Sequence, residues 1–172
     1  DKLMDGQKAT MVFTDPPYGM NLDTDFSSIK GSIPNKGGGK NKYKKIIGDD
    51  KYFDLPDFII ALADDVFLWG ADYYKDSIPL GGSWVVWDKV LTESLGKSFG
   101  SNFELCWSKQ KHKRDIARIK WSGFYGFEKE DTPKKIHPTQ KPVKLAEWFF
   151  DKWGKDKTNI IDLFLGSGST LI

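Results

Sequence analysis

The fold is decided by the stretch Ala9-Thr10-Met11-Val12-Phe13-Thr14-Asp15-Pro16-Pro17-Tyr18. Its first six residues form a short, mostly apolar run of the kind that builds a buried strand. Pro16 and Pro17 end that run, because neither has an N–H group to donate to a sheet ladder. The pattern predicts a buried strand over residues 9–14 that carries Asp15 at its carboxyl end.

Further strands and helices are expected along the chain. Short apolar runs predict four more strands, over residues 66–69, 83–87, 103–107 and 159–164. Helical spacing and helix-start residues predict two helices, over residues 54–64 and 143–153. An alternating run over residues 116–121 is expected to pair in a hairpin, and a third helix is expected to open at Gly166. Apolar strands mixed with helices are typical of an α/β layered fold with a mostly parallel sheet.

Composition narrows the class of protein. The 172 residues are expected to form a single domain over residues 1–172, and no apolar run approaches the roughly 18 residues of a membrane span. The single cysteine, Cys106, excludes an intrachain disulfide and, with only two histidines, argues against a Cys/His metal site. Cys106 is predicted to be a small buried residue. We expect a cytoplasmic protein with no membrane or metal partner.

Basic residues gather in two segments, although the net charge is only +2. The first lies within a polar segment over about residues 19–50, which is predicted to be a mobile basic loop. The second covers residues 109–120. Together with an aromatic content of 15%, these segments suit a surface that holds phosphates and stacks bases. Composition alone favours solvated loops around an aromatic core instead. The predicted phosphate contacts are Lys36, Lys40, Lys42, Lys44, Lys45, Lys111, Lys113, Arg114 and Arg118.

The stretch Asp15-Pro16-Pro17-Tyr18 suits the activation of an amino group on a nucleobase. Such a nitrogen is a poor nucleophile, because its lone pair is delocalised into the ring, and two hydrogen-bond acceptors can free that lone pair. Asp15 offers a carboxylate, and the rigid Pro-Pro turn offers a backbone carbonyl. Tyr18 offers a flat face for a base taken out of the duplex stack. Asp-Pro alone is typical of an ordinary turn; the whole stretch at a strand end predicts a catalytic site.

A second motif is Asp162-Leu163-Phe164-Leu165-Gly166-Ser167-Gly168-Ser169-Thr170, which predicts a strand, a glycine turn and a helix start. Backbone N–H groups at such a turn suit the carboxylate of a methionine moiety. Asp162 suits its ammonium group, and Phe164 suits the adenosine side. A phosphate-binding P-loop is excluded, because no lysine follows the glycines. A dinucleotide-binding turn and a plain helix cap stay open as alternatives.

With a third motif, His137-Pro138-Thr139-Gln140-Lys141-Pro142, the chain resembles the bacterial and phage DNA methyltransferases that modify adenine-N6 or cytosine-N4. The resemblance is to the group whose catalytic motif precedes its cofactor motif. It implies a Rossmann-like, S-adenosylmethionine-dependent methyltransferase fold, with a mixed seven-stranded sheet in complete members. Relative to those members the chain is expected to be truncated at both ends, so that its fold and its cofactor half are incomplete.

The resemblance also implies the roles of the motif residues. Catalysis is expected from Asp15, Pro16, Pro17 and Tyr18. Contacts to S-adenosylmethionine are expected from Asp162, Phe164, Gly166, Ser167, Gly168, Thr139, Gln140 and Lys141. Double-stranded DNA is the expected partner, in a bacterial or phage-infected cell, and a small DNA-recognition hairpin is expected over about residues 105–135.

The resulting expectation is a site-specific DNA methyltransferase that acts on a flipped-out base, with adenine-N6 favoured. Cytosine-N4 methylation and a truncated, non-catalytic DNA-binding remnant are the alternatives, together with the same chemistry on RNA bases or on protein glutamine. The sequence does not decide between a monomer and a homodimer.

Overall fold

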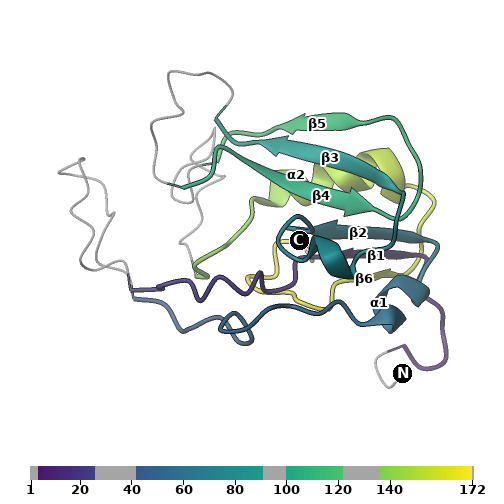
Figure 1. The fold of residues 1–172 in the computed structure, drawn as a ribbon. Helices are drawn as coiled ribbons and strands as arrows, with labels where there is room; N and C mark the ends of the chain where they lie inside the picture. The colour runs from purple at the N-terminus through teal and green to yellow at the C-terminus, as the bar shows by residue number, and fades with distance from the viewer. Residues whose placement is uncertain (1–3, 26–41, 91–99, 122–135, 172) are drawn as a thin grey trace.

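The computed structural model describes residues 4–25, 42–90, 100–121 and 136–171, which build a six-stranded sheet with a helix on each face (Figure 1). The strands are β1 Met11–Thr14, β2 Asp65–Trp69, β3 Ser83–Asp88, β4 Phe103–Ser108, β5 Asp115–Arg118 and β6 Ile160–Ile161. The α-helices are α1 Asp57–Ala61 and α2 Val143–Phe149. A 3-10 turn covers Lys75–Ser77, and α2 continues into a π-helical turn over Phe150–Gly154.

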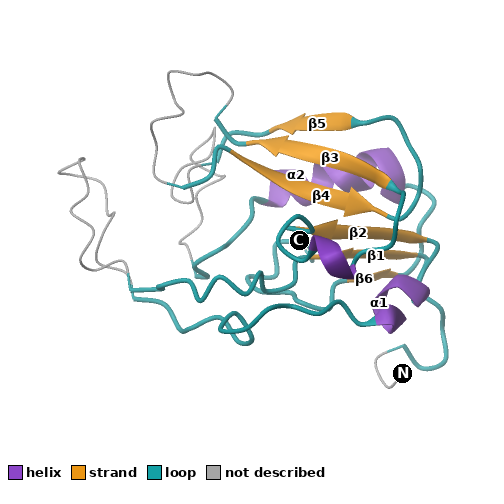
Figure 2. Ribbon diagram, viewed as in Figure 1, coloured by secondary structure: helices purple, strands orange, loops and turns teal. Residues whose placement is uncertain are grey.

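The strand order is β5-β3-β4-β2-β1-β6. β1 pairs in parallel with β2 and with β6, and β3 pairs in parallel with β5. β4 pairs antiparallel with both β2 and β3, so it alone runs against the other strands (Figure 2). The expected α/β fold, a mostly parallel sheet flanked by helices, is confirmed by this arrangement.

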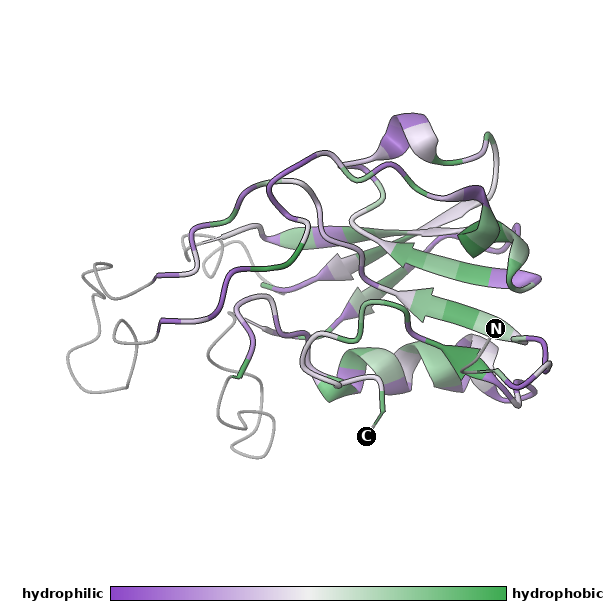
Figure 3. Ribbon diagram, turned by 90° about the horizontal axis from the view of Figure 1, so that it is seen from below, coloured by the Kyte–Doolittle hydropathy of each residue, from purple (hydrophilic) through white to green (hydrophobic). Residues whose placement is uncertain are grey.

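The side chains of β1 and β2 alternate between two apolar layers, as the period of a strand requires. Met11, Phe13 and Phe67 belong to the layer under α2, whereas Val12 and Val66 belong to the layer under α1. Figure 3 shows apolar residues concentrated in the strands and in α2. Because both faces are covered, the central strands are apolar on both sides, which explains their nearly continuous apolar sequences.

Phe149 is the anchor of α2. Its ring is fully buried and contacts the rings of Phe13, Phe67 and Trp69, with centroids 5.0–5.4 Å apart. Burying a side chain of this size stabilises a fold by about 2–3 kcal/mol. This contact fixes the end of α2 against the sheet, while the buried Leu145 holds its first turn, close to the residues just before the helix. No helix within the described segments is long and apolar enough to cross a membrane.

The strand expected over residues 116–121 forms as β5, but it does not pair in a hairpin. β5 pairs in parallel with β3, in the register Val85↔Asp115 to Asp88↔Arg118. The preceding strand β4 has no free edge, because β2 and β3 occupy both of its sides. The chain therefore passes over β3 to reach the outer edge of the sheet. Residues 122–135 of the expected recognition hairpin lie outside the described residues.

The strand expected over residues 159–164 is shorter, and the helix expected at Gly166 does not form by residue 171. β6 ends at Ile161, because the N–H groups of Leu163 and Phe164 donate to the Thr14 hydroxyl rather than to the backbone of β1. Gly166 and Gly168 have φ of +56° and +78°, so the chain turns twice instead of winding into a right-handed helix. The helix N-terminus expected to receive a carboxylate is therefore replaced by a turn.

Candidate active site

β1 and β6 mark the point where the order of the sheet changes direction. They pair in parallel, with Met11 opposite Ile160 and Val12 opposite Ile161. The chain continues from β1 to β2 on one side, and β6 returns on the other. In open α/β sheets, ligands bind beyond the carboxyl ends of the strands at such a point. Asp15 follows β1 directly and Asp162 follows β6 directly, so the two motifs lie side by side at this edge.

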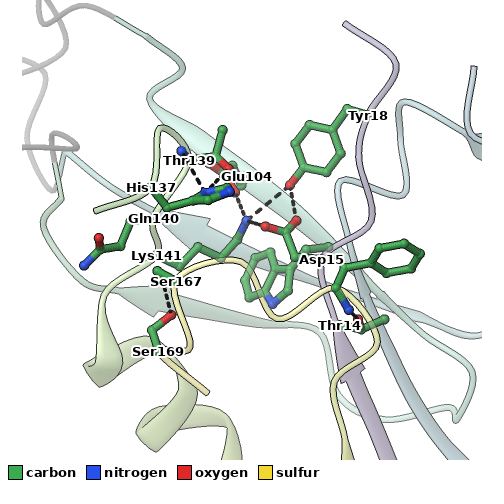
Figure 4. A network of polar contacts seen from close by, with 12 residues as sticks. Thr14, Asp15, Tyr18, Glu104, His137, Thr139, Gln140, Lys141, Ser167 and Ser169 are labelled. Atoms are coloured by element: carbon green, nitrogen blue, oxygen red, sulfur yellow. Dashed lines mark hydrogen bonds and ion pairs between the residues drawn. The ribbon is translucent and has the colours of Figure 1, made fainter. Parts of the chain in front are cut away.

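Asp15 lies at the centre of a polar network (Figure 4). The Tyr18 hydroxyl donates to Asp15 Oδ1 at 2.7 Å, and Lys141 Nζ donates to Asp15 Oδ2 at 2.5 Å. Lys141 Nζ also lies 3.3 Å from the Tyr18 hydroxyl oxygen. Lys141 reaches this position because it stands immediately before Pro142, the N-cap residue of α2. The network holds the Asp15 carboxylate at the edge of the sheet.

Glu104 completes the network, and no sequence motif pointed to it. Because β4 runs against its neighbours, its beginning lies at the same edge as the ends of β1 and β2. Glu104 pairs with Lys141 at 3.1 Å and with Lys89 at 2.8 Å. Burial alone would raise the pKa of Glu104, but the two ammonium groups outweigh burial and lower it to about 2.

The ionisation of Asp15 is balanced differently. Burial raises the pKa of Asp15 above its usual value, Lys141 opposes that rise, and Glu104 adds to it. Burial also raises the pKa of Tyr18, which therefore stays protonated and serves as a hydrogen-bond donor. A carboxylate with a raised pKa at a ligand-binding edge is typical of a group that accepts protons or hydrogen bonds during a reaction.

Tyr18 stacks on Tyr73, a residue that the sequence reasoning missed. Their ring centroids are 4.8 Å apart, with an angle of 8° between the ring planes. Tyr73 lies three residues beyond Gly70, where β2 has ended, and it is 41% exposed. One face of the Tyr18 ring, expected to be open to a base, is therefore covered by a second aromatic ring. The contact joins the turn after β1 to the segment after β2.

Asp162 joins the second motif to the first. Its carboxylate accepts the hydroxyls of Thr14 at 2.7 Å and Thr170 at 2.6 Å, and the backbone N–H of Phe164 at 3.1 Å. The Phe164 ring packs at right angles on Phe53, with centroids 5.5 Å apart. A carboxylate has about four lone-pair sites, so Asp162 retains capacity for one further donor.

The third motif lies between the other two. Its first residue, His137, approaches the glycine turn, since a Cβ built on Gly166 would lie 3.7 Å from His137 Cε1. Thr139 bonds to the His137 ring through its hydroxyl, and the Gln140 side-chain oxygen accepts the N–H of Ile136. Lys141 was expected among the cofactor contacts, but the structure groups it with Asp15 and Glu104.

Asp49 closes the base of the segment that follows Tyr18. Its carboxylate accepts the backbone N–H groups of Gly19, Met20 and Leu22, at 2.8–3.1 Å. Tyr43 N–H donates to the Thr24 carbonyl, so residues 19–25 and 42–50 run side by side. The two ends of the expected mobile loop, residues 19–25 and 42–50, thus form two hydrogen-bonded arms, called the ladder below. Residues 26–41 lie outside the described residues.

The predicted phosphate contacts separate into two groups. Lys42, Lys44 and Lys45 are exposed on the ladder beside the edge of the sheet that carries Asp15, and Arg118 ends β5 at that same edge. Lys111, Lys113 and Arg114 are also exposed, but they lie between the end of β4 and the start of β5, at the opposite edge of the sheet. This second set cannot border a base bound at Asp15. Lys36 and Lys40 lie outside the described residues.

The described residues also bear on metal binding and on thiol chemistry. Within the described ranges, no three His, Cys, Asp or Glu side chains are grouped so that they could hold a metal ion. Cys106 is fully buried within β4, as predicted, and burial raises the pKa of its thiol well above the usual value.

Replacement of Thr14 by Val is expected to loosen the contact between the two motifs. The Thr14 hydroxyl is buried, donates to Asp162 and accepts the N–H groups of Leu163 and Phe164. Losing it leaves buried polar groups without a partner, which costs about 1–3 kcal/mol. We expect that loss of stability in denaturant unfolding, together with weaker ligand binding at Asp162 in calorimetry.

Thr10→Val is the matched control for this prediction. Thr10 bonds in the same way to residues 158–159, at the opposite end of β6. We expect Thr10→Val to lower stability without changing ligand binding, and Thr14→Ser to behave like the unmodified protein. Equal binding by the Thr14→Val and Thr10→Val variants would contradict a coupling role for Thr14.

An α/β protein with a carboxylate, a tyrosine and a lysine grouped at the switch point of its sheet has the form of an enzyme that acts on a ligand at that edge. Comparison with known families gives the class. The chain belongs to the DNA methylase family of N6/N4 methyltransferases, whose model matches residues 71–172. As a member of that family it is a DNA methyltransferase.

The family match contains Glu104, Lys141 and the turn after Asp162, but it does not reach Asp15-Pro16-Pro17-Tyr18. The structure supplies the missing connection, because Asp15 pairs with Lys141 and Thr14 bonds to Asp162. The turn at Asp15-Pro16-Pro17-Tyr18 is therefore in direct contact with the matched part of the chain.

The chain is also similar to a solved structure described as "crystal structure of M1.HpyAVI-SAM complex". The similarity covers 98% of this chain and 78% of that chain, at 19% sequence identity and a TM-score of 0.42. No curated protein matches the sequence.

Proposed function

We propose that this protein transfers a methyl group from S-adenosylmethionine to the exocyclic amino group of a base in double-stranded DNA, with adenine-N6 as the target. The observation that carries this proposal is the position of Asp15. Its carboxylate stands at the end of β1, beside the Asp162 turn, and is held by the Tyr18 hydroxyl and Lys141. An amino group placed at Asp15 lies next to whatever binds at Asp162.

The residues at Asp162 fit a ligand with an ammonium group. The Asp162 carboxylate carries the negative charge of the turn and is fixed by two hydroxyl groups. A Cβ built on Gly168 meets nothing within 4 Å, so the backbone there is open to a ligand. Asp162 would hold the amino-acid end of S-adenosylmethionine, and Phe164 would support the adenosine. When bound, that cofactor supplies an electrophilic methyl group.

Asp15 acts on the other reactant. One of its oxygens accepts a hydrogen bond from the amino group of the base, and a backbone carbonyl in the Pro16–Pro17 turn accepts the second hydrogen. This arrangement frees the nitrogen lone pair for attack on the methyl group. The nitrogen then carries one hydrogen too many, and Asp15 takes that proton. The raised pKa of the Asp15 carboxyl suits this step, because it brings the group closer to the operating pH.

The test is transfer of a labelled methyl group from S-adenosylmethionine to duplex DNA, followed by digestion to nucleosides. We expect the label in N6-methyladenine. Label in N4-methylcytosine would show that the target base is cytosine rather than adenine, and the enzyme would still be a DNA amino-group methyltransferase. RNA and glutamine-containing protein, offered in parallel, test the other amino and amide acceptors. No label in any acceptor, together with no cofactor binding in calorimetry, would contradict the proposal and favour a DNA-binding remnant.

DNA binding is expected to depend on the lysines at the catalytic edge. Replacing Lys44 and Lys45 by Gln should flatten the plot of log affinity against log salt by about 2, since each phosphate contact contributes about 0.9. The matched control replaces Lys111 and Lys113, which are equally charged but lie at the opposite edge. We expect the control to leave the salt slope unchanged in fluorescence anisotropy titrations. The reverse result would place the DNA on the other edge of the sheet.

A further inference from the structure

Lys141 stands between two carboxylates. Its ammonium nitrogen lies 2.5 Å from Asp15 Oδ2 and 3.1 Å from Glu104 Oε2. The three groups come from distant parts of the chain, namely the end of β1, the start of β4 and the residues before α2. The Lys141 side chain is only 13% exposed, and those of Asp15 and Glu104 are 24% and 21% exposed. At this depth, charges interact more strongly than they do in water.

A second cation belongs to the same cluster. Lys89 Nζ lies 2.8 Å from Glu104 Oε1, and its side chain is 14% exposed. Two carboxylates and two ammonium groups therefore balance each other. Lys141 contacts both carboxylates, whereas Lys89 pairs with Glu104.

We propose that Lys141 is a positioning residue that keeps Asp15 ionised while Asp15 holds the target amino group. Glu104 weakens this effect, because it pairs with the same ammonium group and repels the Asp15 carboxylate. This inference rests on the proposed function, because it concerns the state of Asp15 during methyl transfer. An ionised Asp15 offers only acceptors to the amino group. A protonated Asp15 presents an O–H donor instead, and it cannot take up the proton that leaves the nitrogen.

The surroundings of Asp15 make Lys141 necessary. The charged and titratable groups that act on Asp15 are Tyr18, Lys141, Glu104, Tyr74 and Cys106. Burial raises the pKa of Tyr74 and of Cys106, so both stay neutral and neither compensates for the charge of Asp15. Without Lys141, two carboxylates would share a partly buried site with no cation between them, and the pKa of one must then rise strongly.

Lys141→Met is the first test. Loss of the Lys141 ammonium group raises the pKa of the Asp15 carboxyl. Because the ionised form of Asp15 is the active one, methyl transfer then requires a higher pH. We expect the acid limb of the single-turnover rate to move to higher pH, so that the rate measured below the new pKa falls about tenfold when that pKa rises by one. The dissociation constant for DNA should change little. Lys141→Arg keeps the charge and is expected to restore the limb toward its original position.

Glu104→Gln is the second test, and its expected effect has the opposite sign. Removing the neighbouring carboxylate lowers the pKa of Asp15, so the acid limb should move to lower pH. The double variant Lys141→Met/Glu104→Gln removes one cation and one anion, and its limb should lie closer to that of the unmodified protein than the limb of Lys141→Met does. A purely structural role for the pair predicts loss of rate without these opposed movements of the limb.

The ionisation of Asp15 can also be measured without the reaction. The 13C chemical shift of its side-chain carboxyl, assigned with the Asp15→Asn variant, reports the pKa directly in the full chain. We expect a higher pKa in Lys141→Met and a lower pKa in Glu104→Gln. An Asp15 pKa that is the same in all variants would overturn this inference, even if methyl transfer is observed. An unmodified protein that transfers no methyl group at any pH would instead overturn the proposed function.

Discussion

Asp15→Ala is expected to lower the single-turnover rate of methyl transfer by about 100- to 1,000-fold, the usual effect of removing one fixed polar group from a reacting centre. The variant removes the acceptor for the amino group and the site that takes its proton. The fold should persist, because Lys141 keeps its second partner, Glu104, at 3.1 Å. Quenched-flow measurement of product under saturating cofactor and DNA checks the rate, and circular dichroism checks the fold.

Two further variants sharpen this prediction. Asp15→Asn keeps one carbonyl acceptor but loses the charge and the proton-accepting oxygen, so we expect a rate between those of Asp15→Ala and the unmodified protein. Asp72→Ala removes an exposed carboxylate from the segment after β2, and its rate should stay close to normal. A normal rate for Asp15→Ala would remove Asp15 from the reaction.

Gly70→Ala is expected to reduce methyl transfer by about 100-fold, because a displacement of about 1 Å at a reacting centre can have that effect. A Cβ built on Gly70 would lie 2.0 Å from Cε1 of Tyr18, far inside van der Waals contact. Gly70 N–H is tied to the Leu105 carbonyl at 2.8 Å, so the backbone does not give way easily. The Tyr18 ring must therefore move, and its hydrogen bond to Asp15 is lost.

The change also strains the backbone, since Gly70 has φ of +63°, where a side chain costs about 1–2 kcal/mol. Gly6→Ala separates strain from collision, because Gly6 has φ of +76° but nothing within 4 Å of its Cβ position. We expect both variants to lose stability in denaturant unfolding, Gly70→Ala more than Gly6→Ala because of the collision, and only Gly70→Ala to lose rate. Equal rates in the two variants would show that the position of Tyr18 does not limit the reaction.

The elements with local signals are predictable from the sequence. The apolar run over residues 9–14, followed by two prolines, specifies β1 and the position of Asp15 at its end. The strands β2, β3 and β4 and the helix α2 lie within a few residues of their expected bounds for the same reason. The layer order follows from these elements, since apolar strands covered on both faces require helices on both faces.

Contacts between distant segments could not be predicted in this way. Glu104 reaches Lys141 only because β4 is inserted antiparallel between β2 and β3, and nothing in residues 103–108 states that register. The same holds for Tyr73, whose stacking on Tyr18 depends on how the chain turns after β2. The predicted end of β6 was wrong because the hydroxyl of Thr14, far away in sequence, takes the N–H groups that a longer strand would pair.

Charge patterns along the sequence do not show which charges share one surface. Lysines and arginines over residues 109–120 form one cluster in the sequence, yet the sheet divides them between its two edges. Charged residues that are neighbours in the sequence share one surface only when no strand that spans the sheet lies between them. Here β5 runs across the sheet between Arg114, which precedes the strand, and Arg118, which ends it.

Asp49 has a consequence for how this protein can diversify. Its carboxylate accepts hydrogen bonds from the N–H groups of Gly19, Met20 and Leu22, so the chain just after Tyr18 is held in place before it continues toward residue 26. The chain between the two arms of the ladder can therefore change in length or sequence without moving Asp15 or Tyr18. Lengthening that chain adds little entropic cost to folding.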